Sequence, residues 1–255
     1  MPRKYGNPPV VEAVCEFRFE PGDWDSAIFG LVWEEVKGHF PKRRDVQQSG
    51  LQVQVELRLV PTPPSTEQQT APEPRPRVQY LSDDGKSFLI VGPDVLSVNR
   101  LAPYSSWQDL KPLARRGFDA YVSHARPKAI RRAGLRYINR MEFPGEKIKL
   151  DDYFNFRPFL GTTLPQDHAS FILGVEFIYP PAGDALRLQL ASVRPAKEQR
   201  LAVILDLDYF TLLPDSIRVQ SDEAVNWLDR AHGRVEEIFE GTITDRLRSM
   251  FGGEA

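Results

Sequence analysis

The stretch VVEAVCEFRF at residues 10–19 alternates apolar and polar side chains with a period of two. Because successive side chains of a β-strand point to opposite faces, this pattern predicts a strand that is buried on one face and wet on the other. Glu12, Glu16 and Arg18 fall on the wet face. Cys15 falls on the apolar face, which indicates a buried thiol rather than a nucleophile, and as the single cysteine it cannot form an internal disulfide.

The residues after this strand predict a helix, a second strand and a loop. Asp23 can cap a helix over residues 24–40, whose apolar residues recur every three or four positions and which Pro41 ends. Alternation over residues 51–60 predicts another strand. The Pro-, Thr-, Glu- and Gln-rich segment 61–77 predicts a mobile loop, because this composition buries too little apolar area to offset the entropy of ordering it.

The next elements complete a first half and then repeat its order. Two short apolar runs flank the turn pair Asp84-Gly85, and Ser105 or Ser106 can cap a helix that opens on Trp107. The apolar patterns predict strands at 78–81, 88–91, 95–101, 133–143, 171–179, 186–193 and 201–210, a short helix at 151–156, and a closing helix from about Ser221 to Phe251.

This order predicts an α+β fold made of two similar halves, residues 1–126 and 127–255, that form one compact unit. Each half reads β-α-βββ(β)-α, and each closing helix opens near a tryptophan, Trp107 or Trp227. We expect the halves to join into one curved antiparallel sheet with the long helices on one face, as in the saddle of TATA-binding protein. The concave side would then be the candidate site.

Composition and charge narrow the class of protein. The chain has 255 residues and a formal net charge of -2, so no global field draws it to nucleic acid or to an anionic membrane. The first residues lack the apolar core of a signal peptide, and no later segment approaches the roughly 18 apolar residues of a membrane span. These features predict a cytoplasmic protein that does not cross a membrane.

Charged residues on the wet faces of three predicted strands form the candidate site. Residues two apart share a face, so we expect these side chains to project from one surface. The candidate ligand-binding residues are Glu12, Glu16, Arg18, Arg136, Asn139 and Arg140, with Asp206 and Asp208 as candidate metal ligands. Such alternation most often reflects solvated or mutually paired charges on an antiparallel sheet. The alternative is a polar cleft whose arginines hold an anion.

Other residue patterns argue against familiar chemistries. Arg131, Arg132, Arg136 and Arg140 are the densest basic cluster, but carboxylates on the same faces would repel a phosphate backbone. The four histidines are not at metal-ligand spacings, and His232 lies in an apolar stripe, as a core histidine or, less often, an acid/base. The sequence contains no nucleophile elbow, phosphate loop, dinucleotide fingerprint or Cys-x-x-Cys pair.

Two segments carry a resemblance to a known family. Residues 7–19, NPPVVEAVCEFRF, and residues 135–140, LRYINR, resemble the opening and central signatures of a sporadically distributed bacterial family of about 260 residues whose function is unassigned. Val235, Phe239, Ile243 and Thr244 fall where that family has its terminal helix. The resemblance implies no catalytic residue. Sporadic occurrence is typical of accessory systems such as defence or toxin-antitoxin modules.

These observations favour a non-enzymatic binding protein that engages a partner protein or a small anionic ligand and needs no cofactor. The first alternative is a phosphate-handling hydrolase with magnesium or manganese held by Glu12, Glu16, Asp206 or Asp208. It shares only its general design with triphosphate tunnel enzymes. The second alternative is nucleic-acid binding, which the near-neutral charge disfavours. The closing helix also offers a homodimer contact.

Overall fold

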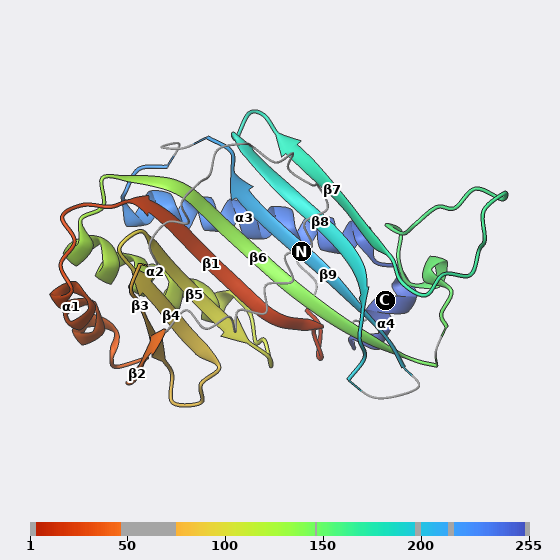
Figure 1. The fold of residues 1–255 in the computed structure, drawn as a ribbon, viewed down its shortest axis with the longest axis horizontal. Helices are drawn as coiled ribbons and strands as arrows, with labels where there is room; N and C mark the ends of the chain where they lie inside the picture. Colours follow the sequence, from red (N-terminus) through yellow and green to blue (C-terminus); the bar gives the residue numbers. More distant parts are fainter. Residues whose placement is uncertain (1–3, 47–74, 146, 197–199, 214–216, 253–255) are drawn as a thin grey trace.

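A single large antiparallel sheet organises the chain. The computed structural model describes residues 4–46, 75–145, 147–196, 200–213 and 217–252. Within these ranges, nine strands pair in the order β2-β3-β4-β5-β1-β6-β9-β8-β7, and every neighbouring pair is antiparallel. Helices α2 and α3 lie behind this sheet in Figure 1. The fold class is therefore α+β, as the sequence predicts.

The elements follow one another in an order close to the predicted one. The first elements are β1 (Val10–Glu20), α1 (Ala27–Val36), β2 (Lys42–Val46), β3 (Arg77–Leu81), β4 (Ser87–Gly92), β5 (Val95–Leu101) and α2 (Trp107–Ala125). The remaining elements are β6 (Ala129–Pro144), a 3-10 turn (Leu150–Asp152), β7 (Ile172–Tyr179), β8 (Asp184–Val193), β9 (Arg200–Thr211), α3 (Ser221–Thr242) and α4 (Asp245–Met250).

The centre of the sheet is the pair formed by β1 and β6. Cys15 lies opposite Leu135, and Phe17 lies opposite Ala133, so the two strands run antiparallel along most of their length. Strands from residues 1–126 and from residues 127–255 thus belong to one sheet. Their side chains alternate between the helix-covered face and the opposite face, as the period of two predicts.

The hydrophobic core lies between the sheet and the helices. Phe17 packs edge-on against Phe118 of α2 with ring centroids 4.9 Å apart, and Phe19 stacks on Tyr121 at 4.7 Å. Cys15 lies on the same face of β1 as Phe17 and is fully buried. This burial raises the pKa of its thiol well above the ordinary value. The prediction of a buried thiol is confirmed.

Local turn and cap signals act where the sequence places them. The Ser106 side chain accepts a hydrogen bond from the Asp109 N–H at 3.3 Å and caps α2, which starts at Trp107. Gly85 adopts a positive φ of 67° in the turn between β3 and β4, a conformation that favours glycine. Both predictions are confirmed.

Two predicted helices have different bounds in the structure. The first begins at Ala27 rather than after Asp23, because the Asp25 carboxylate accepts the Ala27 N–H at 2.6 Å and sets the start of the helix. The closing helix does not run to Phe251. The backbone is extended at Ile243, and Thr244 caps the separate helix α4, so α3 ends at Thr242.

Three further predictions concern short segments or residues outside the described ranges. Strand β2 was not predicted, because its sequence KRRDV has no apolar alternation. The predicted helix at 151–156 is only a 3-10 turn at Leu150–Asp152. The predicted strand at 51–60 and most of the predicted loop at 61–77 lie outside the described residues, and β3 begins at Arg77.

Among the helices that the structure describes, none combines the length and the apolar character needed to cross a bilayer.

Candidate functional site

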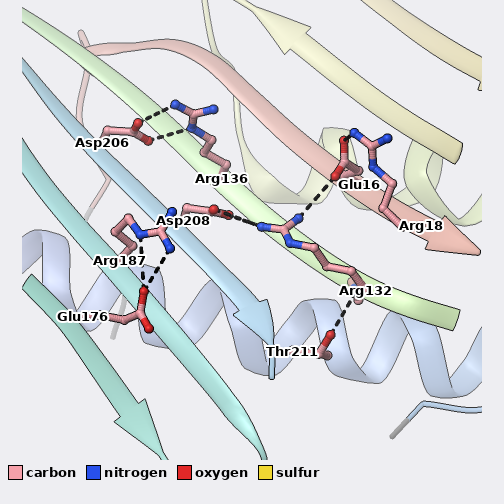
Figure 2. A network of polar contacts seen from close by, with 10 residues as sticks. Glu16, Arg18, Arg132, Arg136, Glu176, Arg187, Asp206, Asp208 and Thr211 are labelled. Atoms are coloured by element: carbon pink, nitrogen blue, oxygen red, sulfur yellow. Dashed lines mark hydrogen bonds and ion pairs between the residues drawn. The ribbon is translucent and has the colours of Figure 1, made fainter. Parts of the chain in front are cut away.

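The sheet face opposite α2 and α3 carries three neighbouring groups of ion pairs, which we together call the ion-pair network. It crosses five strands, β1, β6, β9, β8 and β7, and contains as many arginines as carboxylates (Figure 2). Its members are Glu16, Arg18, Arg132, Arg136, Glu176, Arg187, Asp206 and Asp208. The alternation of the strands places all of them on the face that the core does not use.

Arg132 joins three strands of the network. Its guanidinium donates to Glu16 of β1 at 3.2 Å and to both carboxylate oxygens of Asp208 of β9, at 3.2 and 3.0 Å. Glu16 also accepts from Arg18 at 2.8 Å. Gly134 makes room for this geometry, because a Cβ there would lie 2.5 Å from Nη1 of Arg132. The glycine in the middle of β6 thus lets the guanidinium lie across the strand.

Arg136 forms the best-aligned pair. Its Nε donates to Asp206 Oδ1 at 2.8 Å and its Nη2 donates to Oδ2 at 2.5 Å, which is the bidentate arrangement that suits a guanidinium and a carboxylate. The side chains are 31% and 10% exposed, so the pair is partly withdrawn from water. The hydrogen bonds to Asp206 raise the pKa of Arg136 above its ordinary value.

The remaining pair closes the network at the edge of the sheet. Arg187 of β8 donates to Glu176 of β7 at 3.0 and 3.3 Å. The guanidinium carbons of Arg132 and Arg187 lie 5.1 and 5.4 Å from the ring centroid of Phe210. The aromatic ring therefore sits between two arginines and holds both through cation-π contacts.

Burial and the neighbouring arginines shift the pKa of Asp208 in opposite directions. Burial raises the pKa of its carboxyl above the ordinary value, and Asp206 also raises it, while Arg132 and Arg136 act to lower it. The ionised form of Asp208 is therefore stabilised by its arginine neighbours against the effect of burial.

The structure brings most of the predicted site residues onto one face and separates one of them. Glu12, next in the alternation of β1, accepts a hydrogen bond from Asn99 at 2.9 Å, and Arg140 of β6 donates to Glu142 at 3.0 Å. Asn139 lies on the opposite, core face, where it is 1% exposed and donates to the backbone oxygen of Leu205 at 3.1 Å.

Three members of the network were not among the predicted site residues. Arg132 belonged to the basic cluster that the sequence shows, but Glu176 and Arg187 were not singled out. Both are polar residues within predicted strands, and this pattern could have placed them on the wet face of the sheet. Their pairing with each other depends on the register of β7 and β8, and local sequence does not specify that register.

A metal site finds little support in the geometry. Over the described ranges, no group of three or more histidine, cysteine, aspartate or glutamate side chains is placed to hold a metal ion. Asp206 and Asp208, the candidate metal ligands, each bind an arginine. The guanidinium groups are the parts of this face that suit an anion or a carboxylate.

His232 of α3 lies outside the network, half-buried against α2 and β6. Its ring stacks on Trp107 at 4.7 Å and on Tyr137 at 6.0 Å, and its Nε2 lies 3.3 Å from Glu236. Burial lowers the pKa of His232 to about 4, and Asp229 opposes that shift. Burial also raises the pKa of Glu236. These contacts fit the core histidine that the sequence favoured.

The lowered pKa of His232 predicts a loss of stability in acid. The unfolded chain takes up this proton near pH 6.5, whereas the folded chain takes it up near pH 4, so the free energy of unfolding falls as pH drops through this window. We expect His232 to contribute a loss of about 2 kcal/mol between pH 7 and 5. His232→Phe, which keeps a stacked ring, should weaken the dependence of the free energy of unfolding on pH, measured by urea unfolding at a series of pH values. The same dependence on pH in both proteins would contradict this assignment.

Two surface cavities lie away from the network. One, of about 370 Å³, lies beside the C-terminal end of α2 and is lined by Gly22, Asp23, Leu31, Ser123, His124, Arg126 and Lys128. The other, of about 530 Å³, lies between α3 and the turn after β7. Neither cavity has a member of the network in its wall.

Comparisons with known proteins leave the family open. No protein-family model matches the sequence, and no curated protein matches it.

Proposed function

We propose that the chain is a non-enzymatic interaction protein that uses the ion-pair network to bind a partner protein. One observation carries this proposal: a balanced set of arginines and carboxylates occupies the sheet face opposite α2 and α3, with partners already in place. Their hydrogen bonds hold the guanidinium groups in fixed orientations. A preorganised polar surface lowers the entropy cost of binding.

The balance of charge favours a protein over a small anion or a nucleic acid. Both donor groups of Arg136 that face Asp206 are taken by that carboxylate, so a free anion would have to displace it. A protein surface with its own mixed charges can instead bind the exposed edges of the existing pairs. The carboxylates of the network would repel the phosphates of a nucleic acid.

The duplication of the halves and the saddle shape remain part of this proposal. The strand order supports them, because β1 and β6, the first strand of each predicted half, lie side by side. In that arrangement the network runs from the central strands β1 and β6 to the edge strand β7. A place in a bacterial accessory system, such as defence or toxin-antitoxin, rests on the family resemblance and belongs to the same proposal.

The test is a binding measurement with two arginines at the rim of the face. Arg18 and Arg140 are 35% and 28% exposed, and neither forms a bidentate pair with a buried aspartate. A partner captured from source-cell extract would be purified and titrated by calorimetry. We expect the double change Arg18→Ala and Arg140→Ala to raise Kd about tenfold or more, with an unchanged melting temperature.

The matched control is Arg246→Ala, since Arg246 is an exposed arginine of α4 that is ion-paired with Asp152. It should leave Kd within about twofold of the starting value. Binding that survives the loss of Arg18 and Arg140, or that fails only when the melting temperature also falls, would count against the proposal.

A thermal-shift screen separates this proposal from the hydrolase. The chain would be mixed with nucleotides and polyphosphate, with and without magnesium or manganese. A rise in melting temperature that needs the metal would favour the metal-dependent hydrolase with Asp206 and Asp208 as ligands. No metal-dependent rise is the result that the interaction protein predicts.

A further inference from the structure

The edge strand β7 exposes apolar side chains on both faces of the sheet. On the face of the network, Ile172 and Ile178 are 47% and 55% exposed. On the helix face, Val175 and Phe177 are 36% and 37% exposed. An edge strand with apolar residues on both faces is a surface that favours pairing with another strand.

The opposite edge of the sheet has the features that prevent such pairing. Strand β2, with the sequence KRRDV, carries charges at most of its positions, and charged edge strands resist edge-to-edge association. Strand β7, ILGVEFIY, carries one charge, Glu176, and contains no proline. Glu176 is already neutralised by Arg187 of the neighbouring strand. The two edges therefore differ in their capacity to associate.

The backbone groups of β7 that face outward can be identified. The Ser192 N–H of β8 donates to the Phe171 oxygen at 3.1 Å, so the backbone groups of Phe171 point toward β8. Backbone groups alternate along a strand, so those of residues 172, 174, 176 and 178 point away from the sheet. These residues can form the hydrogen bonds of a further antiparallel strand.

We propose that the occupant of this edge is β7 of a second copy of the chain, paired antiparallel about a two-fold axis at Val175. Such a contact is isologous, so the strand must be complementary to itself. With Val175 on the axis, Ile172 lies opposite Ile178 of the second copy, and Leu173 lies opposite Phe177. The strand then matches apolar residues with apolar residues on both faces.

The position of Glu176 selects this register. Centred on Val175, Glu176 lies opposite Gly174 of the second copy. Centred on Glu176, the two carboxylates would lie directly opposite each other, which destabilises a strand pair. Centred on Gly174, each Glu176 would lie opposite Ile172 and fewer residues would pair. The Val175 register forms about eight backbone hydrogen bonds and joins two sheets into one.

The apolar stripe of α3 is not available for the homodimer contact that the sequence suggested. Its residues Trp227, Leu228, Ala231 and Val235 are buried against the chain's own sheet. The edge of β7, with its exposed isoleucines and outward backbone groups, offers a contact between copies that α3 does not.

Analytical ultracentrifugation of the full chain over a wide concentration range tests the proposal. We expect a reversible dimer. Ile178→Lys places a charge opposite Ile172 in both symmetric pairs, and should raise the dimer Kd about tenfold or more. Ile172→Glu should act in the same way. The control Leu31→Lys, on α1 and 48% exposed, should leave the dimer unchanged.

The decisive variant combines Ile172→Glu with Ile178→Lys. Within one chain these residues are roughly 20 Å apart, so they cannot compensate each other there. In the proposed register each glutamate faces a lysine of the second copy, and the Kd should return to within about threefold of the starting value. The proposal is overturned if the chain stays monomeric or grows into open-ended assemblies. It is also overturned if Ile178→Lys leaves the dimer unchanged, or if the double change does not restore dimer formation. The double variant also decides the matter if a single variant fails to fold.

Discussion

Replacing Trp227 with alanine is expected to lower the free energy of unfolding by about 4 kcal/mol, because it removes a large buried side chain and leaves a cavity. Trp227 is 1% exposed, and its ring lies 5.6 Å from that of Tyr209. Its Nε1 also donates to Asp184 Oδ1 at 3.1 Å, and Asp184 is itself 1% exposed. The change therefore also removes one of the hydrogen bonds on which a buried carboxyl depends. Urea unfolding at pH 7 measures the loss.

A pair of phenylalanine variants separates the hydrogen bond from the packing. Trp227→Phe keeps most of the apolar volume but removes the donor to Asp184, so we expect a loss of about 2 kcal/mol. Trp107→Phe is the matched control. Its indole donates to Asp229, but that carboxylate is 39% exposed and also binds Lys111 at 2.7 Å. It should cost less than Trp227→Phe, and equal losses would show that Asp184 does not depend on the indole.

The strands could be predicted well because their signal is local. The alternation at residues 10–19 appears unchanged as the burial pattern of β1, and β5 has the predicted bounds. Helix ends were harder, since they depend on single cap residues. Asp23 was the cap expected from sequence, but the helix begins at Ala27, whose N–H donates to Asp25.

The candidate site shows how much of a polar surface can be predicted from sequence. Arg136 and Arg140 are an even number of residues apart in one strand, and this is sufficient to place them on one face. The same alternation places Asn139 on the core face, where the structure has it, so it does not share a surface with the other candidate residues. Alternation cannot say which carboxylate an arginine binds. Arg136 lies opposite Asp208 in the register yet binds Asp206, because a long side chain reaches a diagonal neighbour.

Pairing across strands was beyond local reasoning for a physical reason. Arg132 binds residues that are far from it in sequence, Glu16 and Asp208, and the contacts exist only once β1, β6 and β9 are in register. The glycine that makes room for its guanidinium, Gly134, looks like any glycine in a strand. The network is thus a product of tertiary structure. A test of it must compare the loss of one partner of an ion pair with the loss of both.

Replacing Arg136 with alanine is expected to lower the free energy of unfolding by about 3 kcal/mol, because Asp206 would stay 10% exposed without its bidentate partner. The double change Arg136→Met and Asp206→Leu removes both charges and keeps apolar volume, so its loss should be within about 1 kcal/mol. Urea unfolding of the two variants measures the difference. If both variants lose the same free energy, the cost comes from lost packing on the sheet. If the single variant loses more, as we expect, most of the loss comes from leaving the Asp206 carboxylate without its partner, and the pair then holds the Arg136 guanidinium in one orientation.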